Sequence, residues 1–99
     1  MRHRVAPRAA RDLQDIWWHG FEQHGMAVAD DYAARLDQAF TLLADHPELA
    51  RLRTEVDPPI RAWPCRSHLI VYDVGPDGAI TILRVRHHRE DWLSDPIEG

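Results

Sequence analysis

The spacing of apolar residues divides the chain into a helical first part and a strand-rich second part. From Pro7 to His24, apolar positions recur every three or four residues, which is the period of one helix face. The same spacing returns from Val28 to Leu43. Pro7 suits a first helical position, Gly25 suits a helix end and Pro47 stops the second pattern. The pattern therefore predicts a helical hairpin with a short turn at Gly25.

Strand patterns occupy most of the remaining chain. Runs rich in β-branched and aromatic residues, bounded by turn residues, are typical of strands. Between residues 47 and 59 there is no clean period, so we expect an irregular loop there. The turn at residues 75–78, Gly-Pro-Asp-Gly, predicts a hairpin between the two runs that flank it. The expected strands are His3–Val5, Ile60–Trp63, His68–Val74 and Ala79–His87.

Helices first and grouped strands later predict an α+β fold, in which a small antiparallel sheet carries the helical hairpin on one face. The opposite face of the sheet is then the expected place for a partner. Residues 68–74 and 79–87 are apolar on both faces near their middles, so both are expected centrally in the sheet. A chain of 99 residues is one domain, covering residues 1–99.

Composition is that of an ordinary globular protein, with 44% hydrophobic and 28% charged residues. The net charge is −4, yet residues 51–89 hold seven Arg against four acids. An acidic chain is a poor general binder of nucleic acid, because phosphate contacts need cations. The local arginines suit a carboxylate-rich partner instead. No lysine is present, which excludes lysine-based catalysis.

Cofactors and metals are not expected. Cys65 is the one cysteine, so no internal disulfide forms, and Arg66 beside it does not make it a convincing nucleophile. The seven histidines lack the spacing of a metal site. The N-terminus has no apolar leader and no apolar run approaches a membrane span. These features predict a cytoplasmic protein.

Four sequence strings, in order, resemble the ParE toxins of the ParE/RelE superfamily. They are Val5–Trp17, with its Asp-Leu and Ile-Trp pairs; Asp45–Pro47 followed by Glu55 and Pro59–Arg61; Ser67–Tyr72; and Ile82–Asp91. Together they span residues 5–91. Two departures from the usual pattern concern loops: Ala6 stands where a capping Ser or Thr is common, and Ala50 and Pro59 stand where a Gly is common.

The resemblance implies the toxin of a type II toxin–antitoxin system, neutralised by a ParD-like antitoxin in a hetero-oligomer. ParE toxins typically poison DNA gyrase, whereas RelE toxins cleave mRNA on the ribosome. Because the two groups share one fold, the fold does not distinguish between these targets. A member that has lost toxicity and only binds its antitoxin is the third possibility.

Two sets of residues follow as candidates. A RelE-like ribonuclease would need a base, an acid and cations for the phosphorane, and the matching positions are Glu55, Arg61, Arg86, His87 and His88. The alternative for His87 and His88 is that they simply end a strand and have no catalytic role. The alternative for the arginines is that they form internal salt bridges. The candidate partner-binding residues are Trp18, Arg61, Arg86, His87, Arg89 and Trp92. Trp17, Phe21, Tyr32 and Phe40 are expected in the core.

Overall fold

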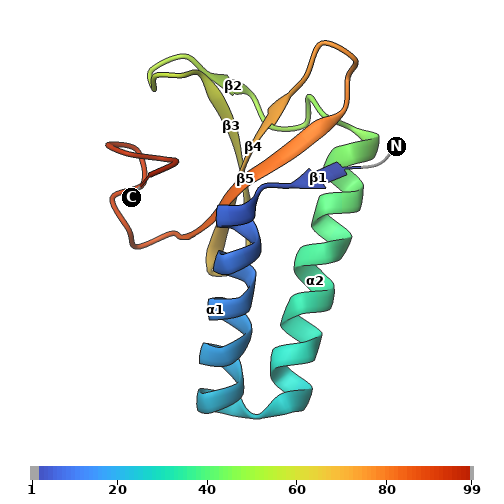
Figure 1. Cartoon of the computed structure of the whole chain (residues 1–99), viewed down its shortest axis with the longest axis vertical. Helices are drawn as coiled ribbons and strands as arrows, with labels where there is room; N and C mark the ends of the chain where they lie inside the picture. The colour runs from blue at the N-terminus through green and yellow to red at the C-terminus, as the bar shows by residue number, and fades with distance from the viewer. Residues whose placement is uncertain (1–2, 99) are drawn as a thin grey trace.

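A five-stranded sheet carries two antiparallel helices on one face in the computed structural model, which describes residues 3–98 (Figure 1). The sheet order is β1-β5-β4-β3-β2. Neighbours are antiparallel except β1, which runs parallel to β5, so the sheet is mixed. The elements are β1 (His3–Val5), α1 (Pro7–His24), α2 (Met26–Asp45), β2 (Leu52–Arg53), β3 (Ile60–Cys65), β4 (His68–Val74) and β5 (Ile80–His87).

The helical hairpin turns on a single residue. Gly25 has φ 88° and ψ 175°, a conformation almost restricted to glycine. Its N–H donates to Phe21 O at 2.8 Å, and its carbonyl accepts from Ala29 N at 3.1 Å. Gly25 thus ends α1 and begins α2, which starts at Met26, before the Val28 position at which the periodicity begins. At the other end of α1, Ala6 is the N-cap and supplies no side-chain hydrogen bond, as its side chain dictates.

The segment between α2 and β3 differs from the irregular loop that its sequence predicts. Leu52 and Arg53 form a short strand that pairs with Arg61 and Ile60. Two further contacts fasten the segment to the sheet. Arg61 donates to Ala50 O at 2.5 Å, and Tyr72 donates to Pro47 O at 2.8 Å. A two-residue strand is too short to leave a period in the sequence.

The main core lies between the hairpin and the sheet, but it reaches only part of the hairpin. Its buried members are Ala9, Leu36, Ala39, Phe40, Leu43, Ala44, Ala50, Ile70, Tyr72, Ile80, Ile82 and Val85. In Figure 1 the connected ends of α1 and α2 extend well beyond the strands. The expectation of core burial is therefore confirmed for Phe40. It is wrong for Phe21, which is 36% exposed because the sheet does not reach beneath this end. Trp17 is half-buried, and so is Tyr32, which packs at the edge of the main core.

A β-bulge in β5 changes which of its side chains face the main core. The register shifts between Val71 and Tyr72, which pair with Arg84 and Ile82, so Leu83 is the extra residue. Such a bulge resets the alternation of side chains along the strand. Ile82 before it and Val85 after it therefore both lie in the main core.

The opposite face of the sheet is covered, contrary to the expectation that a partner would lie there. A second apolar cluster forms on it from Val56, Ile60, Ala62, Leu69, Val71 and Trp92, with Leu83 and Ile97 at its edge. Trp92 and Ile97 belong to the C-terminal segment, residues 88–98, which follows β5. Nothing periodic marks this segment in the sequence, so its packing emerges only from the fold.

Candidate functional site

A cleft opens where the projecting half of the hairpin passes the ends of β4 and β5. Its volume is about 530 Å³. Side chains from both helices and both strands line it: Asp15, Ile16, His19, Gly20, His24, Val28, Ala29, Tyr32, Ser67, His68 and His87. Gly20 matters here, because a Cβ on it would already touch Ala29 at 3.6 Å. The helices therefore pack closely at this level, and the cleft is mostly apolar apart from its four imidazoles, one carboxylate and one phenol.

Tyr32 and His68 are joined by hydrogen bonds in this cleft. Ser67 N donates to the Tyr32 hydroxyl at 3.1 Å, and that hydroxyl lies 2.6 Å from His68 Nδ1. Burial, with a contribution from the neighbouring His87, lowers the pKa of His68 to about 4. Burial likewise raises the pKa of Tyr32. Both side chains are therefore neutral at pH 7.

Three imidazoles follow one another along this edge. The His68 and His87 rings meet edge to face with centroids 5.2 Å apart, and His87 stacks on His88 at 4.7 Å. Arg89 N donates to His87 Nδ1 at 3.1 Å, while His88 Nδ1 lies 2.8 Å from Ser67 O. Nδ1 of each ring is thus engaged, by the Tyr32 hydroxyl in His68 and by the backbone in His87 and His88, which leaves Nε2 of each ring for other groups.

The five candidate ribonuclease residues do not converge. Arg61 is level with Tyr72 on β4, whereas His87 is level with His68, four positions away and about 13 Å along the strand. Glu55 is an exposed partner of Arg51, whose hydrogen bonds hold the pKa of that carboxyl below its usual value. The structure therefore brings together His87 and His88, whose rings stack, while the β4 register separates Arg61 from them.

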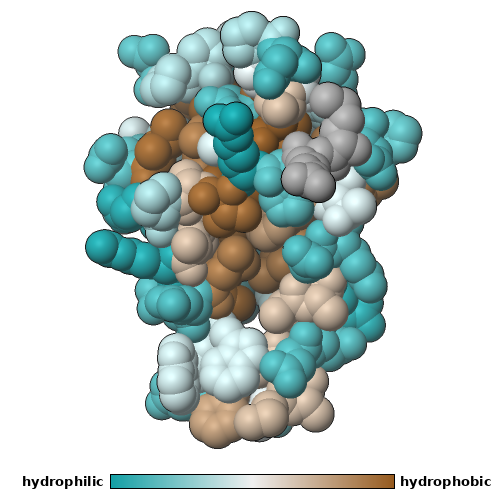
Figure 2. Space-filling model, turned by 45° about the vertical axis from the view of Figure 1, so that its right-hand side comes forward, coloured by the Kyte–Doolittle hydropathy of each residue, from teal (hydrophilic) through white to brown (hydrophobic). Residues whose placement is uncertain are grey.

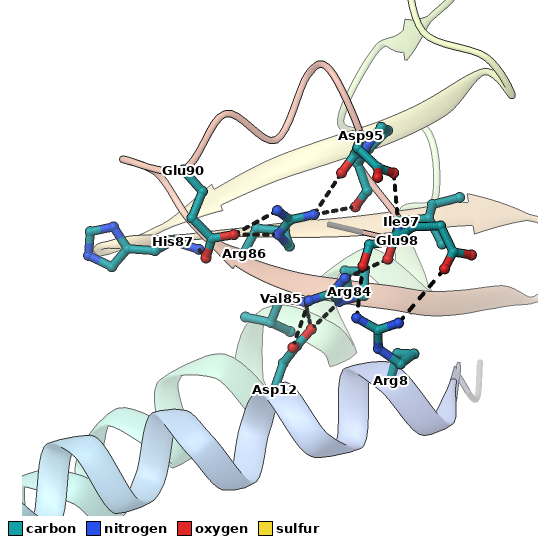
Figure 3. A network of polar contacts seen from close by, with 11 residues as sticks. Arg8, Asp12, Arg84, Val85, Arg86, His87, Glu90, Asp95, Ile97 and Glu98 are labelled. Atoms are coloured by element: carbon teal, nitrogen blue, oxygen red, sulfur yellow. Dashed lines mark hydrogen bonds and ion pairs between the residues drawn. The ribbon is translucent and has the colours of Figure 1, made fainter.

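Arg84 and Arg86 are buried and bind groups of the same chain (Figure 3). Arg84 forms a two-point ion pair with Asp12 of α1, at 2.7 and 3.0 Å. Arg86 donates to Glu90 at 2.7 Å and to the carbonyls of Asp95 and Pro96 at 2.8 and 3.2 Å. Both arginines therefore form internal ion pairs, but the acids are Asp12 and Glu90 and not the expected Glu55, Asp73 or Asp91.

The candidate partner-binding residues separate into two groups. Trp18 is 57% exposed near the tip of the hairpin, Arg89 is exposed and His87 lines the cleft. Trp92 and Arg86 are only 8% and 4% exposed, and the Arg53 guanidinium lies 5.0 Å above the Trp92 ring. Arg61 is half-buried and donates to Ala50 O. The first group is exposed to a partner, whereas Trp92 is buried where the C-terminal segment packs on the sheet and Arg86 is hydrogen-bonded to that segment.

The free end of the hairpin is unusually apolar for a surface. Figure 2 shows it at the bottom of the view, pale to brown where other projections are teal. The exposed apolar residues of this end are Trp18, Phe21, Met26 and Val28. Trp17 stacks on Phe21 at 5.3 Å, and Trp18 meets Phe21 edge to face at 5.7 Å. We call these four exposed residues the hairpin tip.

Sequence reasoning missed the cleft because its parts are far apart in the chain. The sequence predicts Tyr32 in the core, and it predicts that His68 approaches His87 or His88 across the sheet, which is confirmed for His87. Tyr32 and His68 are 36 positions apart, and the fold alone brings them into contact. Within residues 3–98, no three His, Cys, Asp or Glu side chains group in a way that could hold a metal ion. Neither described helix is long and apolar enough to cross a membrane.

Comparison with known proteins now identifies the family. The family described as ParE toxin of type II toxin-antitoxin system, parDE, matches residues 4–92. Toxin ParE1 of Mycobacterium tuberculosis is 31% identical over 90 residues, covering 91% of this chain and 92% of that protein. Toxin ParE1 of Caulobacter vibrioides is 32% identical over 85 residues, which is 86% of each chain.

The fold is also that of a solved relative. A chain from the chromosomal ParDE TA system of P. aeruginosa superposes with a TM-score of 0.76 at 20% identity, covering 88% of this chain and 95% of that one. This likeness confirms the α+β fold, with two helices on a five-stranded sheet. The family match extends over nearly the whole described chain, as the four ordered strings suggested. The chain belongs to the ParE toxin family of type II toxin–antitoxin systems.

Proposed function

We propose that this toxin is held inactive by a ParD-like antitoxin in the cytoplasm and that, once free, it inhibits DNA gyrase. Family membership over residues 4–92 supports both parts, because ParE toxins typically have this partner and this target. The dispersal of the candidate ribonuclease residues favours inhibition by binding over mRNA cleavage. In this chain Arg86 is committed to Glu90, and Arg61 lies about 13 Å along the strand from His87.

The antitoxin is proposed to lie along the hairpin and over the sheet edge, adding a helix or strand. Exposed aromatic and apolar side chains are frequent anchors of protein interfaces, and the hairpin tip supplies four. Binding to the folded toxin alone raises its stability by about 4 kcal/mol at a thousandfold excess over Kd. The melting temperature should therefore rise when purified cognate antitoxin is added. An unchanged melting temperature at saturating antitoxin would contradict this partnership.

The target is tested with antitoxin-free toxin in two reactions run side by side. One measures gyrase supercoiling and trapped gyrase–DNA cleavage, and the other measures mRNA cleavage during translation in vitro. Trapped gyrase with intact mRNA supports the proposal. Cut mRNA with normal supercoiling would assign the RelE-like activity, and His87 and His88 would then be the first residues to substitute. Silence in both, from folded protein, would indicate a member that has lost toxicity.

A further inference from the structure

The hydrogen bonds of the cleft fix the tautomers of two histidines, and those tautomers define what the cleft can bind. The relevant pair is His68 and His87, which face each other on β4 and β5. Each uses Nδ1 within the protein. Which of the two nitrogens carries the proton decides whether the remaining Nε2 donates or accepts a hydrogen bond.

His68 is a neutral ring that carries its proton on Nε2. The Tyr32 hydroxyl accepts a hydrogen bond from Ser67 N, and donating its own proton to His68 Nδ1, 2.6 Å away, gives both groups a partner. The lowered pKa of His68 keeps the ring from taking a second proton at pH 7. With Nδ1 as the acceptor, Nε2–H is left as a donor on a ring that lines the cleft.

His87 reaches the same tautomer by another route. Its Nδ1 accepts the backbone N–H of Arg89 at 3.1 Å, so a neutral ring must carry its proton on Nε2. His88 is the useful contrast. Its Nδ1 faces a carbonyl, Ser67 O, at 2.8 Å and must donate, so its Nε2 is an acceptor. Of the four histidines that line the cleft, His68 and His87 thus offer N–H groups in this tautomer, while His88, which does not line it, offers a lone pair in its neutral form.

We propose that the cleft binds a segment of the antitoxin that places an Asp or Glu carboxylate against the Nε2–H groups of His68 and His87 and an adjacent apolar side chain against Ile16, Val28 and Ala29. This inference rests on the proposed antitoxin partnership. Two N–H donors in a largely apolar cleft match an acceptor group carried on an apolar segment, and hydrogen bonds to a charged acceptor are the stronger kind. The cleft volume of about 530 Å³ suits one such anchor.

A nucleic-acid phosphate fits this cleft less well than a carboxylate of a peptide. Among residues 3–98, no arginine lines the cleft, and Asp15 stands on its wall. Phosphate sites in proteins draw on cationic side chains, which supply the counter-charge. Val28 belongs both to the cleft wall and to the hairpin tip, so a peptide anchored in the cleft would continue onto exposed apolar surface. That continuity favours a protein segment.

The first experiment examines the tautomers in the free toxin. Side-chain ¹⁵N spectra at pH 7 distinguish Nδ1–H from Nε2–H histidine, and assignment by single substitutions identifies His68 and His87. We expect the Nε2–H form for both and the Nδ1–H form for His88. An Nδ1–H tautomer at His68 or His87 would overturn the proposal, since the ring would then offer an acceptor to the cleft.

The second experiment measures affinity for purified cognate antitoxin. Gln places its amide near the Nε2 position, whereas Asn places it near Nδ1 and leaves nothing at Nε2. His87→Gln should bind within about threefold of the wild type, and His87→Asn should bind about tenfold more weakly. His68→Gln and His68→Asn should show the same order. His46→Asn, on an exposed histidine at the end of α2, is the matched control.

Charge substitutions on the cleft wall give an independent readout. Val28→Glu adds a carboxylate at the cleft and should weaken binding about tenfold, while Leu42→Glu, an exposed site on α2 outside the cleft, should not. Asp15→Asn removes a like charge and should tighten binding by about threefold. Equal affinities across the Val28, Asp15 and histidine variants, with tight wild-type binding, would overturn this inference alone. A wild-type toxin that binds no antitoxin would overturn the proposed function as well.

Discussion

Asp12 connects α1 to the sheet through a buried charge, and its removal should be among the most damaging single changes outside the apolar core. Its carboxylate accepts two hydrogen bonds from Arg84 and one from Val85 N, at 2.7, 3.0 and 2.9 Å. The side chains of Arg84 and Asp12 are only 8% and 14% exposed. The bonds from Asp12 also hold the Arg84 guanidinium charged, which raises the pKa of Arg84 despite its burial. Asp12→Ala would leave that cation buried without its counter-charge.

The expected loss is about 3–5 kcal/mol, the usual cost of removing one partner from a buried ion pair. A chain of this size has a total stability of about 5–15 kcal/mol, so the variant should be at the edge of folding. Asp12→Asn keeps one acceptor oxygen and should lose less, about 2–3 kcal/mol. With a urea m-value of about 1–3 kcal/mol per molar, the Asn variant should shift the unfolding midpoint by about 1 M or more.

Urea unfolding followed by tryptophan fluorescence measures these losses. Asp15→Asn is the matched control, because Asp15 is exposed on the same helix, and it should change stability by less than about 0.5 kcal/mol. Combining Asp12→Asn with Arg84→Met should recover part of the loss, since the apolar side chain needs no counter-charge. A loss below about 1 kcal/mol for Asp12→Ala would refute the view that the pair is isolated from water.

Three further changes test other parts of the structure. Gly25→Ala should lower the free energy of unfolding by about 1–3 kcal/mol, because φ 88° with ψ 175° is almost restricted to glycine. Gly20→Ala lies within a helix and should raise it by up to about 1 kcal/mol. Equal effects of the two substitutions on thermal unfolding would contradict this. Trp92→Ala should cost about 3–5 kcal/mol, far more than Trp18→Ala, and the reverse order would show that the C-terminal segment is not packed. The pKa of His68 is lowered to about 4 from 6.5, so the unfolded chain binds the extra proton first. The contribution of neutral His68 to the free energy of unfolding should therefore be fully present above pH 6.5 and fall between pH 6.5 and 4, by about 1 kcal/mol for this half-buried ring. The His68→Gln variant should lose less stability over that range.

The sequence predicted the elements well because each carries a local signal. The three-and-four spacing on the helices, Pro7, Gly25 and the Gly-Pro-Asp-Gly turn all act within a few residues of one another. The parallel pairing of β1 with β5 has no such signal. It is extended by Ala6, whose N–H donates to Ile82 O, so the hydrogen bonds between β1 and β5 continue up to the start of α1.

The site was much less predictable, since it depends on contacts between distant positions. His87 and Arg89 were among the candidates, but Tyr32 and His68 gain their roles only when α2 crosses the end of β4. Trp92 was a candidate as an exposed aromatic anchor, and Arg86 was a candidate as part of a cationic face, but both are buried. Burial of Trp92 depends on residues 88–98 folding back over the sheet, and no local pattern encodes that return.

The central claim is that a ParD-like antitoxin controls a gyrase inhibitor, and one titration tests it most directly. Gyrase supercoiling is measured at a fixed inhibitory concentration of toxin while purified cognate antitoxin is added stepwise. The proposal predicts that toxin alone blocks supercoiling and that activity returns fully once antitoxin sites equal toxin molecules. Normal supercoiling at saturating folded toxin, or inhibition that persists in antitoxin excess, would contradict it.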